Sequence, residues 1–246
     1  MAVNPPGISV VVPARDEAAL IGDSVQRVAT ELDAIGRHYE IIVGDSASSD
    51  GTGERACAAH PAVRLVRCEL PGKGRVLTAA MRDARGAYVG FIDSDLEIAP
   101  SYIASFVAAL DAGYDAASAT KVSPEARRQR RFQRRLATDS YNRLVRALLG
   151  TPYTDHQAGL KLFRRDVLLS ALEHVSSTGW AWDTEVLVQL SRGGRSVAEI
   201  AVVPRTTRPN RLPMARVAFE LMRGIGGVLR RQGPARRPRA GSGPRA

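Results

Sequence analysis

Residues 88–97 read YVGFIDSDLE, a short apolar run that ends abruptly in three acidic side chains. The run Tyr88–Ile92 has the length and the β-branched and aromatic content of a buried strand. Asp93, Asp95 and Glu97 follow it within five residues. The stretch therefore predicts a buried strand that delivers carboxylates to one edge of a sheet.

Two earlier apolar runs end in the same way. Ile8–Ala14 is followed by Arg15–Glu17, and Tyr39–Gly44 is followed by Asp45-Ser46. Helical patterns separate such runs, and this alternation predicts a mostly parallel sheet with helices on both faces. Ligands of such sheets bind at the carboxyl ends of the strands, so we expect the three polar clusters to share one site.

The remaining pattern completes an α/β fold with a Rossmann-like N-terminal half. Further strands are predicted at Val63–Cys68, Gly159–Arg164 and Ser196–Val203. The predicted helices share an apolar stripe at helical spacing and cover 18–35, 75–85, 101–110, 124–149, 183–191 and 212–231.

We expect one domain over residues 1–232. A nucleotide-binding half would cover about 8–122, an acceptor half about 123–212, and a basic amphipathic helix about 212–231. Residues 233–246 hold only small, polar and basic side chains, which predicts a disordered basic tail.

The charge of the chain is +10, and it is carried almost entirely by arginine. The only lysines are Lys73, Lys121 and Lys161. Seven basic residues lie between Lys121 and Arg135 against one acid, Glu125. Such a balance favours an anionic partner, which could be a nucleic acid, an anionic lipid or a phosphorylated substrate.

Nothing in the sequence indicates secretion or a membrane span. The N-terminus lacks the pattern of a signal peptide, and no window approaches the ~20 apolar residues of a membrane helix. Two cysteines, Cys57 and Cys68, suit a reducing compartment. We therefore expect a cytoplasmic protein, with attachment to the cytoplasmic face of a membrane as an addition.

Asp93, Asp95 and Glu97 are the predicted ligands of Mg²⁺ or Mn²⁺. Carboxylate oxygens suit such hard cations, and a nucleoside diphosphate needs one to neutralise its charge as it leaves. An Asp-x-Asp pattern alone is more often a solvated loop, but its position directly after a buried strand reverses that preference.

Two further segments carry candidate ligand-binding residues. Asp45 emerges from a buried strand, where an unpaired carboxylate is costly, and a ribose or base would satisfy it. Asp50 is expected only to cap the next helix. Gly72–Gly74 precedes a helix, where glycine backbone and the charge of Lys73 could approach a phosphate, although a simple turn explains the pattern equally well.

Together these motifs resemble the family-2 glycosyltransferases with a GT-A fold, and in particular the dolichyl- or polyprenyl-phosphate mannosyl- and glucosyltransferase branch. The resemblance spans about Ile8 to Leu212. It rests on six segments: Val12–Glu17, Asp45–Thr52, Gly72–Gly74, Asp93–Glu97, Asp155–Arg165 and Gly179–Glu185.

The resemblance implies roles for individual residues. The nucleotide sugar would contact Pro13, Ala14, Glu17, Val43, Asp45, Lys73, Asp93 and Ser94. Acceptor or donor phosphate would contact Lys121, Arg135, Arg205 and Arg211. Asp95 and Asp155 would act in catalysis, with Asp155 beside the sugar.

The expected function is inverting transfer of a hexose, mannose or glucose, from a GDP- or UDP-sugar to a polyprenyl or dolichyl phosphate. The helix 212–231 would hold the protein on an anionic membrane, with Val217, Leu221, Ile225, Val228 and Leu229 inserted. A soluble transferase acting on a small-molecule hydroxyl is one alternative, for which Asp155 is the candidate base. A non-catalytic nucleic-acid-binding protein is a weaker alternative, because aromatic residues are scarce.

The Asp95→Ala variant should lose turnover by several orders of magnitude while keeping its fold. The substitution removes a hard oxygen ligand from a site that must neutralise a leaving diphosphate. Sugar transfer and circular dichroism measure the two effects. Near-normal rates in both this variant and chelator-treated protein would refute the metal requirement.

Overall fold

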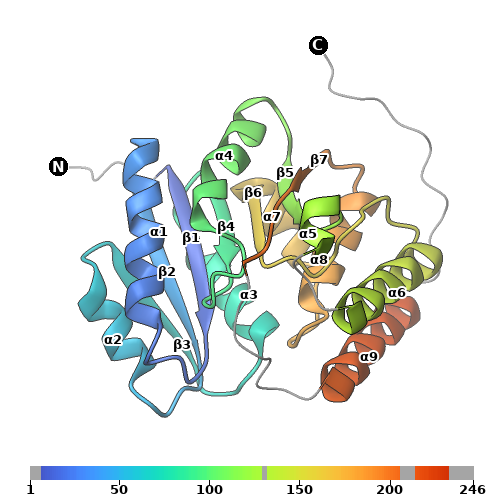
Figure 1. Cartoon of the computed structure of the whole chain (residues 1–246), viewed down its shortest axis with the longest axis horizontal. Helices are drawn as coiled ribbons and strands as arrows, with labels where there is room; N and C mark the ends of the chain where they lie inside the picture. The colour runs from blue at the N-terminus through green and yellow to red at the C-terminus, as the bar shows by residue number, and fades with distance from the viewer. Residues whose placement is uncertain (1–6, 129–131, 206–213, 233–246) are drawn as a thin grey trace.

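The computed structural model describes residues 7–128, 132–205 and 214–232, with the side chains of 127–128, 132–134, 214–217 and 232 excepted. The described residues form one seven-stranded sheet in the order β3-β2-β1-β4-β6-β5-β7 (Figure 1). The strands are β1 (Ile8–Ala14), β2 (Tyr39–Ser46), β3 (Val63–Cys68), β4 (Tyr88–Ile92), β5 (Ala116–Thr120), β6 (Leu160–Arg164) and β7 (Val197–Ala201).

Most neighbouring strands in this sheet are parallel. β3, β2, β1 and β4 form a continuous parallel half, and β5 and β7 are parallel to each other. β6 runs antiparallel to both of its neighbours, β4 and β5. The predicted α/β class and mostly parallel sheet are therefore confirmed.

Helices cover both faces of the sheet, as the alternating pattern predicted. The helices are α1 (Ile21–Ile35), α2 (Thr52–Ala59), α3 (Lys73–Asp83), α4 (Ile103–Asp111), α5 (Pro124–Arg128), α6 (Phe132–Leu149), α7 (Arg165–Leu172), α8 (Trp182–Arg192) and α9 (Met214–Gln232), with a 3₁₀ turn at Pro100–Tyr102.

The two faces have separate cores because side chains along each strand alternate. On one face, Val10 and Val12 of β1 pack with α1 and α4. On the other face, Val11 packs with α3, α7 and α8. β1 is thus buried on both sides, which explains its unbroken apolar sequence.

β5 and α7 were missing from the sequence prediction, and α2 was expected only as a helix start after Asp50, without bounds. β5 reads Ala-Ala-Ser-Ala-Thr, and these small residues lack the bulky β-branched pattern of a strand although all five are buried. α7 follows β6 without any turn residue, since β6 ends at Arg164 and α7 begins at Arg165. The predicted helix 124–149 is described as two helices, α5 and α6.

The apolar stripe of α9 packs against the domain, which corrects its predicted insertion into a membrane. Ile225 and Val228 are buried among Val145 and Leu149 of α6 and Val188 of α8, and Leu221 is buried as well. Figure 1 shows α6 and α9 side by side. Burial of this face against the domain is favoured because it removes the stripe from water without a lipid.

An ion pair also fixes α9. Arg231 Nη2 lies 2.8 Å from Oε1 of Glu185, a fully buried carboxylate on α8. The same carboxylate accepts the backbone N–H groups of Ser176 and Ser177. Arg231 therefore serves the fold. Arg211 and the tail 233–246 lie outside the described residues, as do the side chains of Arg216 and Val217.

The Ile225→Ala variant should lower the free energy of unfolding by about 2–5 kcal/mol, the usual cost of truncating a buried isoleucine. The matched change Met222→Ala, on the exposed side of the same helix, should change it by less than about 0.5 kcal/mol. Urea unfolding measures both. Equal, small effects would show that α9 does not pack on the domain in solution.

Candidate active site

The polar clusters after β1, β2 and β4 meet at one edge of the sheet, as predicted. Ala14, at the end of β1, is in register with Asp45 of β2. Backbone and side-chain hydrogen bonds then join the loops after these strands. Asp16 N–H donates to Ser48 Oγ, and Glu17 N–H donates to Thr52 Oγ1. These hydrogen bonds hold the loops after β1 and β2 together at this edge of the sheet.

The residues expected to line the base and ribose divide into two groups. Val43 and Ala14 are buried in the hydrophobic core, and Pro13 is buried beside them in β1. The helices on the two faces of the sheet cover their side chains. Their contact with the nucleotide stays a prediction. Glu17 and Asp45 lie at the edge itself.

Asp45 already has partners, so its burial needs no ligand. Its side chain is 1% exposed, with Oδ2 3.2 Å from Arg67 Nε and Oδ1 accepting the N–H of Ser48 at 2.9 Å. Arg67 also pairs with Glu54 of α2 at 2.7 Å. Asp50 accepts the N–H groups of Ala18 and Thr52 and so closes the loop ahead of α2. Its role is structural, as expected, but the N-cap of α2 is Gly51, so the predicted cap is wrong.

A chain of alternating charges lies beneath Asp93. Lys73 Nζ is 2.9 Å from Asp93 Oδ1 and 3.3 Å from Asp183 Oδ2. Lys161 Nζ is 3.1 Å from Asp183 Oδ1. Asp183 and Lys161 are completely buried, and burial of such charges is tolerated only where they are paired.

The charges in this chain fix one another's ionisation. Burial alone would lower the pKa of Lys73, but Asp183 and Asp93 outweigh it and hold that pKa above its ordinary value. Burial alone would raise the pKa of Asp183, but Lys73 and Lys161 outweigh it and lower that pKa. Lys73 and Asp183 are therefore ionised at neutral pH.

The glycines flanking Lys73 serve packing. A Cβ on Gly72 would lie 2.4 Å from the carbonyl oxygen of Thr178, and one on Gly74 would lie 2.6 Å from that of Ser177. The N–H of Arg75 donates to the same Thr178 oxygen at 3.0 Å. The structure thus gives the Gly72–Gly74 motif contacts with the segment before α8, and its approach to a phosphate stays a prediction.

Asp95 carries poorly compensated negative charge. Partial loss of solvent around the carboxylate raises the pKa of Asp95, and the nearby charge of Asp93 raises it further. Asp95 Oδ1 accepts the N–H of Glu97 at 3.0 Å, which closes a tight turn through Leu96 at a left-handed φ of 48°. A cation bound here would relieve this repulsion.

Glu97, Lys121 and Asp155 form a second cluster beside the first. Lys121 Nζ lies 3.3 Å from Glu97 Oε2, and the N–H of Lys121 donates to Asp155 Oδ2 at 3.2 Å. Asp155 Oδ1 accepts the N–H of Gln157 at 3.0 Å. Asp155 is 1% exposed. Both carboxylate oxygens of this predicted base are therefore already engaged by backbone N–H groups.

The neighbouring His156 is also structural. Its ring lies between Thr151 Oγ1 and Asn142 Oδ1, and burial lowers its pKa to about 4. The imidazole is therefore neutral at pH 7 and fully occupied by its partners.

The described residues fit a divalent cation that binds together with a diphosphate. They include no group of three His, Cys, Asp or Glu side chains arranged to hold a metal. Asp93 and Asp95 could hold such a cation; Glu97, the third predicted ligand, is paired with Lys121, as Asp93 is with Lys73. Mg²⁺ in nucleotide sites commonly takes one or two carboxylates and completes its shell with phosphates and water.

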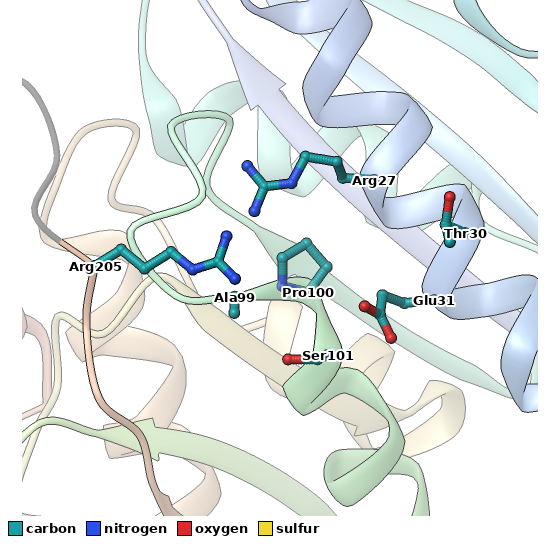
Figure 2. A pocket seen from close by; sticks show the side chains of 7 residues that line it. All are labelled: Arg27, Thr30, Glu31, Ala99, Pro100, Ser101 and Arg205. Carbon is teal, nitrogen blue, oxygen red and sulfur yellow. The ribbon is translucent and has the colours of Figure 1, made fainter.

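Two of the arginines expected to bind phosphate, Arg135 and Arg205, lie within the described residues. Arg205 lines a hollow of about 200 Å³, where its guanidinium and that of Arg27 both point toward Pro100 (Figure 2). The backbone N–H of Arg205 donates to the carbonyl oxygen of Glu97 at 2.7 Å. The chain at Arg205 therefore lies against the acidic motif Asp93–Glu97. Arg135 is half-buried in α6.

Sequence reasoning missed Asp183, Lys161 and Gly159 as parts of this site. A Cβ on Gly159 would lie 2.1 Å from Asp93 Oδ2, so only glycine fits beneath that carboxylate. The signal was present: Gly159 and Lys161 lie in the segment Asp155–Arg165 and Asp183 lies in Gly179–Glu185, two of the six segments that carry the resemblance. Their roles depended on contacts between distant segments.

A mostly parallel sheet with acidic residues at its carboxyl edge is the architecture of GT-A glycosyltransferases. The chain belongs to glycosyl transferase family 2, whose family model matches residues 9–170. Membership of this family favours an enzyme over the nucleic-acid-binding alternative.

Similar proteins include two curated transferases. The chain is 32% identical over 202 residues to glycosyltransferase AglD of Haloferax volcanii, covering 79% of this chain and 32% of AglD. It is 29% identical over 177 residues to undecaprenyl-phosphate 4-deoxy-4-formamido-L-arabinose transferase of Shewanella sediminis, covering 70% of this chain and 52% of that protein. The chain thus spans about a third to a half of these relatives.

Among solved structures, glucosyl-3-phosphoglycerate synthase of Mycobacterium tuberculosis is similar, with a TM-score of 0.73 and 25% identity. The match covers 94% of this chain and 81% of that chain. That structure contains Mn²⁺, UDP and glucosyl-3-phosphoglycerate.

The Gly159→Ala variant should lose at least about a hundredfold in turnover while remaining folded, because even a small misplacement of a site group can cost that much. The added methyl group would displace the Asp93 carboxylate. The matched variant Gly226→Ala, which meets no atom within 4 Å, should keep its activity. Sugar transfer and thermal unfolding distinguish the two. Normal turnover by Gly159→Ala would mean that the position of Asp93 is not critical.

Proposed function

We propose that the protein transfers a hexose from a nucleoside diphosphate sugar to a polyprenyl phosphate, with a divalent cation bound beside Asp93 and Asp95. The observation that carries the donor part is the pair of carboxylates after β4, at the same carboxyl edge of the parallel sheet as Asp45, with Lys73 2.9 Å from Asp93. The family assignment and the UDP and Mn²⁺ in the similar synthase structure support it.

Two observations favour a phosphate as the acceptor. The Shewanella relative is named for transfer to undecaprenyl phosphate. In addition, both oxygens of Asp155, the base expected for a hydroxyl acceptor, accept backbone N–H groups. A phosphate oxygen is already ionised and requires no base.

The reaction we propose is a displacement at the anomeric carbon. An acceptor phosphate oxygen forms a bond to the anomeric carbon while the bond between that carbon and the diphosphate oxygen of the donor breaks. The electron pair of the broken bond leaves with the nucleoside diphosphate. Because the acceptor attacks from the opposite side, the configuration inverts. A bound divalent cation would supply charge neutralisation for the departing diphosphate. Lys73 lies near enough to Asp93 to add to that positive field.

We further propose that the protein meets its acceptor at a membrane surface through α6 and α9. No helix among the described residues is long and apolar enough to cross a membrane. The exposed sides of these two helices carry large apolar side chains, namely Leu136, Leu148, Phe219 and Met222. Exposed arginines accompany them, including Arg143, Arg223 and Arg230. Apolar anchors with arginine suit an anionic surface.

A second candidate is transfer to a small phosphorylated acceptor. The similar synthase structure contains a glucosylated phosphoglycerate. Such an acceptor shares the negative charge of a lipid phosphate but reacts through a hydroxyl group.

A donor and acceptor panel tests the proposal. Labelled UDP- and GDP-hexoses with Mn²⁺ or Mg²⁺ are supplied with polyprenyl phosphate in anionic vesicles or with 3-phosphoglycerate in solution. We expect label in the organic extract. The Asp93→Asn variant should be inactive, whereas the matched surface change Asp111→Asn, which affects a pair with Arg37, should retain activity.

The outcomes separate the acceptors. Label confined to the aqueous phase would replace the lipid acceptor by the small phosphorylated one. Labelling of neither acceptor with any donor would refute hexose transfer. A Phe219→Ser, Met222→Ser double variant should lose activity on vesicles and keep it on a short-chain, water-soluble prenyl phosphate. Equal loss on both would contradict the membrane role of α9.

A further inference from the structure

Lys73 occupies the position next to Asp93 where a bound cation would be expected. Its ammonium lies 2.9 Å from Asp93 Oδ1. The other oxygen, Oδ2, lies over Gly159, where there is no room for a methyl group. The carboxylate predicted to hold the metal is thus enclosed by an ammonium on one oxygen and by backbone under the other.

The lysine is held in this place by the interior of the protein. Asp183 binds the ammonium from the buried side at 3.3 Å, and Lys161 fixes Asp183 in turn. The rings of Phe91 and Trp180 lie 4.9 and 5.6 Å from Nζ, within the range of cation–π attraction. The side chain of Lys73 is 11% exposed. If it moved into solvent, Asp183 would lose one of its two ammonium partners.

An ammonium and a divalent cation on one carboxylate repel each other. The part of the chain that the structure describes offers no three-carboxylate group whose charge could offset that repulsion. The diphosphate of a nucleotide could, because it brings two or more negative charges to the same place.

We infer that Lys73 is an internal counter-ion of Asp93 that makes divalent-metal binding depend on the nucleoside diphosphate. The inference rests on the proposed function, since it concerns the same donor site. In the free protein, Lys73 neutralises Asp93 and disfavours the metal. With a diphosphate bound, its negative charge balances both cations, so the metal and the nucleotide bind as a unit.

Mn²⁺ binding, followed by the electron paramagnetic resonance of free Mn²⁺, tests this with and without UDP or GDP. Wild-type protein should bind Mn²⁺ at least about tenfold more tightly when the preferred nucleotide is present, a typical size for coupling between two ligands. The Lys73→Gln variant should bind Mn²⁺ alone about tenfold more tightly than wild type. Its gain from the nucleotide should shrink by the same factor.

Two variants control for charge and folding. Arg82→Gln removes a cation from the exposed side of the same helix α3 and should leave Mn²⁺ binding unchanged. The alternative variant Lys73→Met removes the same charge, leaves the Asp183–Lys161 pair intact and serves if Lys73→Gln does not fold. It should show the same gain in affinity for Mn²⁺ alone.

The results distinguish this inference from the proposed function. If wild type binds Mn²⁺ with nucleotide but Lys73→Gln binds Mn²⁺ alone no more tightly than wild type, the counter-ion role is wrong and the proposed function stands. An equal gain in Mn²⁺ affinity in Arg82→Gln would also overturn the inference, because the gain would then be a general effect of removing positive charge. If wild type binds no Mn²⁺ with either nucleotide, the metal part of the proposed function fails, and the inference fails with it.

Discussion

The ion chain Asp93–Lys73–Asp183–Lys161 is the constraint on which the rest of the site depends. It joins the end of β4, the start of α3, the start of α8 and β6, so four segments distant in sequence must come together before its charges are paired. Replacing such a buried network with apolar residues often costs no stability. Its value here lies in the position that it imposes on Asp93.

The use of lysine follows from this constraint. The chain has only three lysines among 35 basic residues, and all three contact carboxylates at the site: Lys73, Lys121 and Lys161. An ammonium is a compact point charge that fits between a carboxylate and aromatic rings, whereas a guanidinium is a broad planar fork. Gly72 and Gly74 support the same contacts, because their lack of a side chain lets α3 approach the segment before α8.

The sequence was sufficient to predict the parallel half of the sheet and the convergence of Asp45, Asp93 and Asp95, because apolar runs ending in acids are local patterns. β5 was not predictable in this way, since its alanines and serine owe their burial to neighbouring strands. The roles of Asp183 and Gly159 arise from contacts across the fold. The stripe of α9 was visible as amphipathic, but its spacing could not indicate whether protein or lipid would cover it.

Diffraction from crystals soaked with Mn²⁺ and the preferred nucleotide, UDP or GDP, is the most direct test of the account. The anomalous signal of Mn²⁺ should lie within coordination distance of the Asp93 and Asp95 carboxylates and of the diphosphate, with the base and ribose over the ends of β1 and β2. An ion bound elsewhere, or a nucleotide away from this edge of the sheet, would contradict the central claim that these strand ends form the donor site.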